Sequence, residues 1–264
     1  MLKIENVHKT FNAGTVNEKK ALQSLNLELK EGEFVTVIGG NGAGKSTMLN
    51  VVAGVYGVDS GKILIDDIDV THLPEFKRAK YIGRVFQDPM MGSAATMQIE
   101  ENLALAARRG KSRTLRSGIT KAEREEYREQ LKILDLGLED RMTAKVGLLS
   151  GGQRQALTLL MATLQQPKLL LLDEHTAALD PKTAAKVLEA TEKIVRKSQL
   201  TTMMITHNMR DAIAHGNRLI MMYDGHIVVV VSGEEKKNLT VEQLLNLFSQ
   251  AGGSDEVDDK RVLG

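Results

Sequence analysis

The stretch GGNGAGKST, residues 39–47, constrains the fold more than any other part of this 264-residue chain. It follows the apolar run 34–38, which predicts a buried strand, and leads into residues 48–54, whose apolar spacing predicts a helix. The order strand, glycine loop, helix is typical of phosphate-binding loops. The pattern G-x-x-x-x-G-K-[ST] is met by Gly39, Gly44, Lys45 and Ser46.

The chemistry of a bound triphosphate accounts for each part of this loop. Glycines let the backbone curl so that its N–H groups converge on phosphate oxygens, and the helix adds its positive N-terminal end. Lys45 is expected to reach the β and γ phosphates, and Ser46 to offer its hydroxyl to Mg²⁺. A glycine turn that only caps a helix is the alternative, which the strand and helix on either side disfavour. The residues expected to bind the phosphates here are Gly39, Gly40, Asn41, Gly42, Ala43, Gly44, Lys45, Ser46 and Thr47.

The composition is that of an ordinary globular chain, with 42% hydrophobic and 26% charged residues. A net charge of +1 gives no reason to expect a nucleic-acid partner, and the lack of cysteine excludes disulfides and thiolate metal sites. The N-terminus does not resemble a secretory signal. Apolar runs such as 169–172 and 227–231 are far shorter than the roughly 18 to 20 residues that cross a bilayer. We therefore expect a cytosolic chain that reaches a membrane only through a partner.

Alternation of apolar and polar residues predicts two antiparallel strands, at 2–7 and 25–29, near the glycine loop. Helical spacing replaces the strand pattern from about residue 90 to 166, as at Leu131, Leu134 and Leu138, which predicts a helical subdomain inserted into an α/β body. Further strands are expected at 62–65, 81–86, 169–172, 202–206, 218–223 and 226–231, and helices at 182–197 and 241–249.

A basic segment, residues 108–128, lies within the helical region and carries a net charge of +5, from eight basic and three acidic residues. Attraction to anionic lipid headgroups is one interpretation. An ordinary solvated surface is favoured, and the lack of aromatic residues other than Tyr127 disfavours nucleic-acid binding.

The sequence LSGGQ, residues 149–153, predicts a second anion site. Ser150 and Gln153 form a capping box at the start of a helix. A capping box does not require two glycines in the first turn, where each costs up to about 1 kcal/mol relative to alanine. Glycines are useful there when a phosphate must approach the backbone closely.

Polar side chains follow three of the expected strands. Asp173 and Glu174 end the buried run 169–172; because adjacent strand residues face opposite sides, one is expected to complete a Mg²⁺ shell and the other to face the γ-phosphate. Gln87 ends another strand, where its amide oxygen can bind Mg²⁺ or a water. His207 has no second histidine at metal-ligand spacing, so a phosphate contact is favoured over a metal.

Together these motifs resemble the ATP-binding subunits of ABC transporters in order and spacing, over residues 1 to about 240. The matching segments are GGNGAGKST at 39, Gln87, LSGGQ at 149, LLLLDE at 169, ALD at 178 and His207. The segment 174–180 is most similar to bacterial importer ATPases that work with a separate permease and a substrate-binding protein. Gly40 and His175 stand where prolines are often found in this family; neither change removes a ligand.

The resemblance implies an α/β fold: a P-loop NTPase (RecA-like) core with an antiparallel β subdomain and an inserted helical subdomain. The ATPase domain would span 1–240, with the core and β subdomain in 1–88 and 167–240 and the helical subdomain in 89–166. Residues 241–264 would form a C-terminal helix and a disordered tail.

The resemblance also implies a role for each motif residue. Phe11 would stack on adenine, and the Mg²⁺ shell would include Ser46, Gln87 and Asp173. Glu174 would be the catalytic carboxylate, assisted by His207 at the γ-phosphate and by Gln87. Ser150, Gly152 and Gln153 would bind the nucleotide of a partner subunit, and Asp180 would act across that dimer.

The implied function is an ATPase that energises transport of a small solute, with import favoured. Its partners would be a second ATP-binding subunit (a homodimer), integral-membrane permease subunits and an extracellular substrate-binding protein. The chain would lie on the cytoplasmic, inner face of the cell membrane. The alternative is a soluble ABC-type ATPase that serves an assembly or translation system without a membrane partner.

Overall fold

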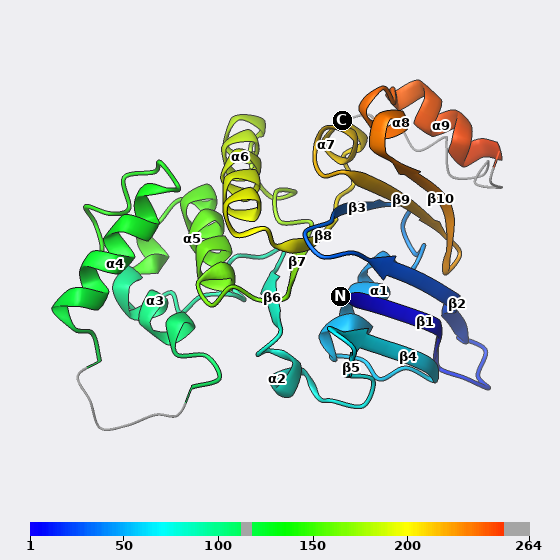
Figure 1. Cartoon of the computed structure of the whole chain (residues 1–264), viewed down its shortest axis with the longest axis horizontal. Helices are drawn as coiled ribbons and strands as arrows, with labels where there is room; N and C mark the ends of the chain where they lie inside the picture. Colours follow the sequence, from blue (N-terminus) through cyan, green and yellow to red (C-terminus); the bar gives the residue numbers. More distant parts are fainter. Residues whose placement is uncertain (112–117, 251–264) are drawn as a thin grey trace. The chain divides into compact units, whose positions relative to one another are not determined.

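The computed structural model describes residues 1–111 and 118–250. These residues fall into two compact units, the first made of Met1–Tyr81 and Thr201–Gly264 and the second of Ile82–Leu200 (Figure 1). The tail expected beyond residue 250 lies outside the described residues, as do Arg113 and Arg116 of the basic segment.

The first unit contains a four-stranded antiparallel sheet in the order β2-β1-β4-β5. β1 and β2 pair from Leu2 opposite Leu29 to Phe11 opposite Lys19, so the expected antiparallel pair is confirmed and is longer at the Phe11 end than its apolar pattern indicated. The strands are β1 (Leu2–Phe11), β2 (Lys19–Leu29), β4 (Ser60–Ile65) and β5 (Ile68–Asp69).

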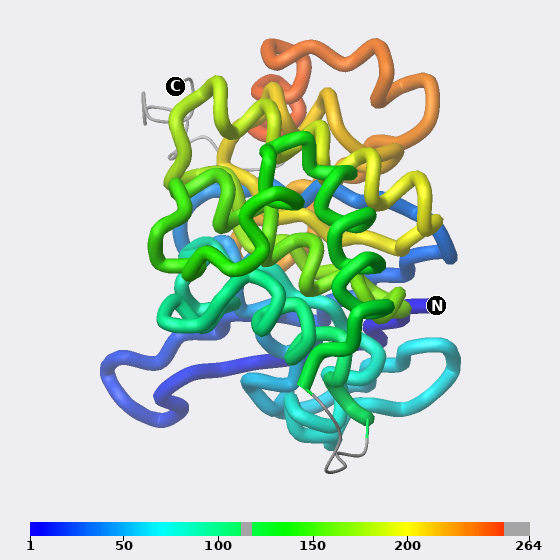
Figure 2. The backbone as a smooth tube through the Cα atoms, turned by 90° about the vertical axis from the view of Figure 1, so that its left-hand side faces the viewer, coloured from blue at the N-terminus to red at the C-terminus, as the bar shows by residue number. Residues whose placement is uncertain are grey.

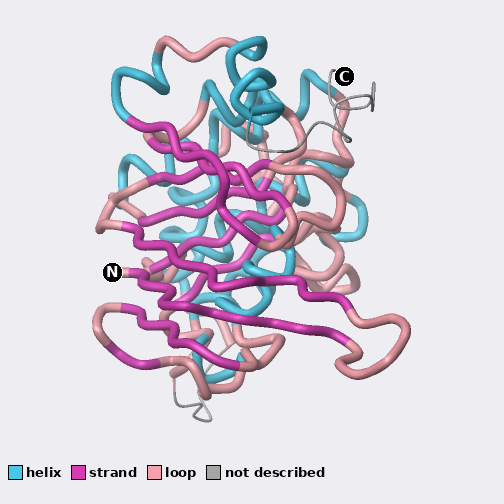
Figure 3. The backbone as a smooth tube through the Cα atoms, turned by 90° about the vertical axis from the view of Figure 1, so that its right-hand side faces the viewer, coloured by secondary structure: helices cyan, strands magenta, loops and turns pink. Residues whose placement is uncertain are grey.

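A second run of strands in the same unit has the order β10-β9-β3-β8, with β3 parallel to both neighbours. The strands are drawn in magenta in Figure 3. All five residues of β3 are buried, as the apolar run predicted. The strands are β3 (Phe34–Ile38), β8 (Thr201–Ile205), β9 (Arg218–Tyr223) and β10 (His226–Ser232). The helices of this unit are α1 (Lys45–Ala53), α2 (Glu75–Arg78), α7 (Met209–Ala214), α8 (Gly233–Lys237) and α9 (Val241–Gln250).

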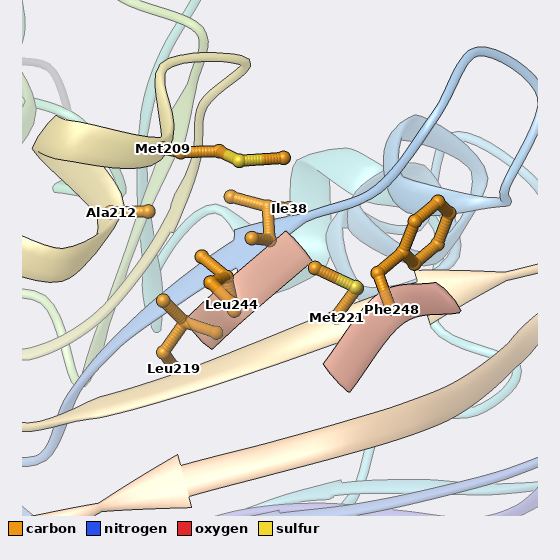
Figure 4. Close-up of a cluster of buried hydrophobic side chains, with 7 residues drawn as sticks. All are labelled: Ile38, Met209, Ala212, Leu219, Met221, Leu244 and Phe248. Atoms are coloured by element: carbon orange, nitrogen blue, oxygen red, sulfur yellow. The ribbon is translucent and has the colours of Figure 1, made fainter. Parts of the chain in front are cut away.

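The C-terminal helix α9 packs its apolar face onto these strands (Figure 4). Leu244 is fully buried and Phe248 is 6% exposed, and the ring of Phe248 meets that of Tyr223 edge-on at 5.8 Å. The buried cluster consists of Ile38, Met209, Ala212, Leu219, Met221, Leu244 and Phe248. The cluster therefore joins the end of the strand before the glycine loop to α7 and α9.

The second unit pairs β6 with β7 in parallel, from Ile82 opposite Leu169 to Val85 opposite Leu172, and its remaining elements are helical (Figure 2). The strands are β6 (Ile82–Val85) and β7 (Leu169–Asp173). The helices are α3 (Ile99–Ala107), α4 (Lys121–Lys132), a short 3₁₀ helix (Val146–Leu148), α5 (Gly151–Thr163) and α6 (Pro181–Ser198).

The helical spacing read through Leu134 and Leu138 was wrong in detail, because α4 ends at Lys132. Both leucines are buried, at 5% and 0% exposure, but they lie beyond the helix, Leu134 in a turn and Leu138 in irregular structure. Buried residues in irregular structure can by coincidence follow the spacing of a helix. The apolar periodicity therefore predicted a helix that continues past its true end. The helical region expected at 89–166 lies within the second unit. Across the described part of the chain, no helix combines the length and apolar character that a bilayer crossing requires.

Candidate nucleotide-binding site

The glycine loop has the backbone geometry of a phosphate cradle. Gly39 and Gly44 have φ angles of +148° and +102°, and a Cβ at residue 39 would collide with the carbonyl oxygen of Met222. At Gly44 a Cβ would come within 2.6 Å of the Ala21 carbonyl oxygen. Gly44 is also the N-cap residue of α1, where it supplies no side chain to the first helical N–H groups. The N-terminal end of a helix that follows a glycine turn in this way is suited to binding an anion.

The turn between β9 and β10 is hydrogen-bonded to this loop. The N–H of Gly225 donates to the carbonyl oxygen of Ala43 at 3.0 Å, and the N–H of Gln23 donates to Gly225 at 3.1 Å. A turn follows from the strands expected at 218–223 and 226–231, but its contact with the loop does not, because the two segments are nearly two hundred residues apart.

Lys45 is buried inside the loop, where its ammonium nitrogen donates to the carbonyl oxygens of Gly39 at 2.6 Å and Gly40 at 2.9 Å. Ser46 is exposed at the start of α1. A positive charge held within the glycine loop is a good match for a polyphosphate.

Phe11 is half-buried at the end of β1, and its ring meets that of Tyr56 edge-on at 5.3 Å. Lys19 is opposite Phe11 in the β1–β2 pair. Its ammonium group lies beside Gly42 of the loop, 2.8 Å from where a Cβ would be. Sequence reasoning missed this lysine, whose charge is unremarkable in a polar hairpin. The adenine-stacking role of Phe11 stays a prediction.

His207 is exposed and follows β8 by two residues. Asn208 caps the next helix, its Oδ1 accepting from the N–H groups of Arg210 at 2.9 Å and Asp211 at 3.2 Å. Burial raises the pKa of Asp211, and the nearby His215 opposes that shift. Before His207, the N–H of Thr206 donates to the carbonyl oxygen of Val37 at 3.1 Å, so hydrogen bonds fix the backbone on both sides of His207.

In the second unit, Asp173 ends β7 and pairs with Arg84 of β6, whose Nη2 is 3.2 Å from Asp173 Oδ2. Both side chains are largely buried, at 13% and 18% exposure. The guanidinium also lies 4.7 Å from the centre of the Phe86 ring. Sequence reasoning missed Arg84, although its place in a short strand before Gln87 gave a signal.

Glu174 lies beyond the strand, with a φ angle of +46°, and is half-buried. The argument that strand alternation separates Asp173 from Glu174 was therefore wrong in its reason, since β7 ends at Asp173. A left-handed turn, rather than the pleat, sets the direction of the Glu174 side chain. Such strain in a non-glycine residue is common at functional sites.

His175, which stands where a proline is often found, is 2% exposed. Its Nε2 is 3.2 Å from the hydroxyl oxygen of Thr191 on α6. The Thr191 hydroxyl donates to the Val187 carbonyl at 2.8 Å, so Nε2 of His175 is the donor in their contact. A hydrogen bond from the His175 side chain therefore holds this position, where a proline would restrict the backbone through its ring.

Gln87 is exposed in the loop after β6, and its role as a Mg²⁺ ligand stays a prediction. The preceding residue is tied to α5, because Nε2 of Gln155 donates to the Phe86 carbonyl oxygen at 3.0 Å. Gln155 is 1% exposed and its Oε1 is buried without a hydrogen-bond partner. This link between the LSGGQ helix and the Gln87 loop was not foreseen.

The LSGGQ segment forms the N-terminus of α5 with the expected capping box. Ser150 Oγ accepts from the Gln153 N–H at 3.3 Å, and Gln153 Oε1 accepts from the Ser150 N–H at 3.2 Å. Gly151 is exposed, but Gly152 is buried, and a Cβ there would collide with the methyl group of Thr183 on α6. Close helix packing is therefore a second reason for glycine at 152, beside the phosphate argument.

Asp180 is the N-cap of α6, where its Oδ1 accepts from the Thr183 N–H at 3.1 Å. Hydrogen bonds from the Thr183 side chain and backbone lower the pKa of Asp180, which keeps it ionised at neutral pH. Thr183 thus donates its N–H to Asp180 and packs its methyl group against Gly152. It therefore links the two segments that are expected to face a partner subunit.

Three of the described basic side chains of the segment, those of Arg108, Arg124 and Arg128, pair with acids. Arg124 makes a bidentate pair with Glu100 at 2.7 and 2.8 Å, and Arg108 is 2.8 Å from Glu123. Burial lowers the pKa of Arg109. This arrangement favours an ion-paired surface over a stripe free to bind lipid headgroups.

The oxygen-bearing side chains expected to bind metal are of the kind that Mg²⁺ prefers beside a nucleoside triphosphate. The hydroxyl of Ser46, the amide of Gln87 and the carboxylate of Asp173 offer oxygen, the ligand atom that Mg²⁺ prefers. No group of three or more histidine, aspartate or glutamate side chains suited to a metal occurs in residues 1–111 and 118–250. Donors that include a single carboxylate suit Mg²⁺ when phosphates and water supply most of its ligands.

Comparison with known proteins agrees with this geometry. The ABC transporter family model matches residues 22–177. A tyrosine transport ATP-binding protein of Clostridioides difficile is 44% identical over 95% of this chain and 100% of its own length. The spermidine/putrescine import ATP-binding protein PotA of Pasteurella multocida is 34% identical over 93% of this chain and 65% of its own length.

Solved structures lead to the same family. An ATP-binding cassette solved as a dimer in a post-hydrolysis state, bound to ADP and Pi, has a TM-score of 0.75 at 33% identity, covering 88% of this chain and 98% of its own. The ADP conformation of another ABC transporter cassette has a TM-score of 0.77 at 26% identity, covering 94% and 98%.

The P-loop NTPase fold and its motifs define a nucleotide-hydrolysing protein, and the expected fold class is confirmed. The chain belongs to the ABC transporter family. Within that family it is an ATP-binding subunit, an ATPase.

Proposed function

We propose that this protein powers the import of a small solute by binding and hydrolysing ATP between two copies of itself that meet head to tail. The observation that carries the proposal is that one chain holds two anion-binding elements of different kinds. The first is the glycine loop around buried Lys45, and the second is the capped, glycine-containing start of α5 at Ser150. A solved relative that is dimeric with ADP and Pi supports the pairing.

In this mechanism the loop of one subunit binds the triphosphate of ATP. Lys45 and the loop N–H groups, with the residues from Gly39 to Thr47, neutralise the phosphate charge, and Phe11 stacks on adenine. Ser46, Gln87 and Asp173 would hold Mg²⁺, which neutralises charge on the phosphate oxygens when bound. Arg84 fixes the orientation of the Asp173 carboxylate.

Hydrolysis requires a water placed opposite the bond that breaks. Glu174 accepts the proton of that water as it attacks the γ-phosphorus, and His207 donates a hydrogen bond to the γ-phosphate. Ser150, Gly152 and Gln153 bind the nucleotide held by the partner copy, and Asp180 acts across the same dimer. Closure on ATP and release after hydrolysis then drive the transport cycle.

The membrane partners in this proposal are permease subunits, with an extracellular substrate-binding protein delivering the solute to them. The chain would work at the cytoplasmic face of the membrane, and the loop at Gln87 would pass its motion to the permease. We also propose the division into an ATPase domain, 1–240, and a C-terminal extension, 241–264, with the helical subdomain at 89–166. The full-length likeness to a tyrosine transport ATP-binding protein makes an amino acid such as tyrosine the first solute to test.

The experiment is purification of the tagged protein from its native membranes in mild detergent, followed by reconstitution into vesicles. We expect an integral-membrane partner to co-purify, and ATP supplied on the side of this subunit to drive labelled tyrosine away from the opposite side. A functional complex that moves solute in the other direction would make the system an exporter. Lack of any membrane partner would favour the soluble assembly or translation ATPase.

A further inference from the structure

The helix that follows His207 is too short to be stable without contacts to the rest of the protein. α7 has six residues, Met209–Ala214, and helices of this length are marginal without external support. Its N-terminal end is capped by Asn208, and its apolar side enters the cluster with Leu244 through Met209 and Ala212 (Figure 4). Its C-terminal end needs other partners for its carbonyl groups.

Lys236 of α8 supplies those partners. Its ammonium nitrogen donates to the carbonyl oxygens of Ile213 at 3.1 Å, Gly216 at 3.2 Å and His215. Three N–H donors thus meet three acceptors, which is the full donor capacity of a lysine ammonium group. The side chain is 2% exposed, and burial of a charge on this scale is tolerated only when its hydrogen bonds are made.

The remaining supports of α7 come from β3. The Thr36 hydroxyl donates to the Ala212 carbonyl oxygen at 2.8 Å, and the Asn217 N–H donates to the Phe34 carbonyl oxygen at 2.9 Å. The positive charge of Lys236 also opposes the negative end of the helix dipole. Lys236 is therefore the charged member of a set of contacts that fixes α7 against the strand that leads into the phosphate loop.

We propose that Lys236 is a positioning residue for His207, acting through α7 to hold the imidazole where it meets the γ-phosphate. The inference rests on the γ-phosphate role proposed above for His207. Neutral replacement of Lys236 leaves the carbonyls at the end of α7 without donors, so the short helix frays and His207 loses its fixed place. The phosphate loop itself, held by Gly225 and Lys45, stays formed.

The chain contains its own control. Lys237 is the next residue of the same helix, but its side chain is 70% exposed and it pairs only with the exposed Glu234 at 2.6 Å. Lys236→Met and Lys237→Met thus make the same chemical change at a buried and an exposed position. Lys236→Arg keeps charge and donors, and tests for rescue.

The measurement uses full-length protein and compares dissociation constants for ADP and for the non-hydrolysable analogue AMP-PNP, together with kcat for ATP. We expect Lys236→Met to bind ADP as the wild type does, to lose its preference for AMP-PNP over ADP, and to lower kcat about tenfold or more, as misplaced catalytic groups do. Lys237→Met should match the wild type, and Lys236→Arg should recover much of the loss. A lowered melting temperature with unchanged kcat and unchanged preference would overturn the inference.

His207→Ala separates this inference from the proposed function. If His207→Ala keeps the wild-type preference for AMP-PNP, the γ-phosphate role is wrong and the inference falls with it. If His207→Ala loses that preference while Lys236→Met keeps it, the inference alone is wrong. Should Lys236→Met not fold, Lys236→Gln, which retains an amide donor, takes its place under the same criteria.

Discussion

Arg84 and Asp173 form an ion pair between neighbouring parallel strands, with 3.2 Å between Nη2 and Oδ2. The pair orients the carboxylate proposed to bind Mg²⁺, and it lies where water has little access. An ion pair in this setting differs in its energetics from the exposed pairs on the helices of the same unit.

Arg84→Met should lower the free energy of unfolding by about 1 to 3 kcal/mol, because it leaves a largely buried carboxylate without its partner. Arg128→Met is the matched control, since Arg128 pairs with Glu125 at exposures of 38% and 65%. Removal of that exposed pair should cost less than about 1 kcal/mol. Urea unfolding of both variants measures the difference, and equal losses would contradict the importance given to burial.

Glu174→Gln should bind ATP but hydrolyse it at least about a hundredfold more slowly, the scale typical of a lost general base. The amide cannot accept the proton of the attacking water, so the protein should accumulate as an ATP-bound dimer. Steady-state turnover and size-exclusion chromatography with ATP test both points. Near-normal turnover would mean that another group is the base.

Lys45→Ala should weaken nucleotide binding itself, by about ten- to a hundredfold, because it removes charge-assisted hydrogen bonds to the phosphates. Titration with ADP and ATP measures the affinity directly. Lys20→Ala, at an exposed position on β2, is the control for loss of one positive charge. Unchanged affinity in Lys45→Ala would contradict the placement of its ammonium group among the phosphates.

Gly152→Ala should lower the free energy of unfolding by about 1 to 3 kcal/mol, as overpacking does, because the new methyl group meets that of Thr183. Thr183→Ser removes the opposing methyl group, so the double variant should regain stability. ATPase activity then distinguishes the two reasons for glycine. Activity that returns with stability assigns Gly152 to helix packing, whereas activity that stays low assigns it to close approach of a phosphate.

The sequence predicted the elements whose signals are local. The run from Phe34 to Ile38, the glycine loop and the capping box at Ser150 are short-range patterns in which neighbouring residues determine the backbone. For this reason the strand before the phosphate loop, the helix after it and the helix after LSGGQ lie where they were expected.

Sequence patterns failed where a contact joins residues far apart in the chain. The end of α4 at Lys132, the left-handed turn at Glu174 and the packing of Gly152 on Thr183 depend on neighbours that periodicity does not reveal. Short helices such as α7 were missed for a different reason, because six residues are too few to show a helical periodicity.

The sequence by itself determined the phosphate loop and the capped start of the helix after LSGGQ, because each is encoded by residues adjacent in the chain. Only the tertiary structure decided how these groups are held. Arg84 reaches Asp173 from another strand, Gly225 supports Ala43 from the far end of the chain, and Lys236 closes the end of α7. These contacts join residues that are far apart in the sequence and close in the folded protein. No local sequence pattern marks the groups that make them.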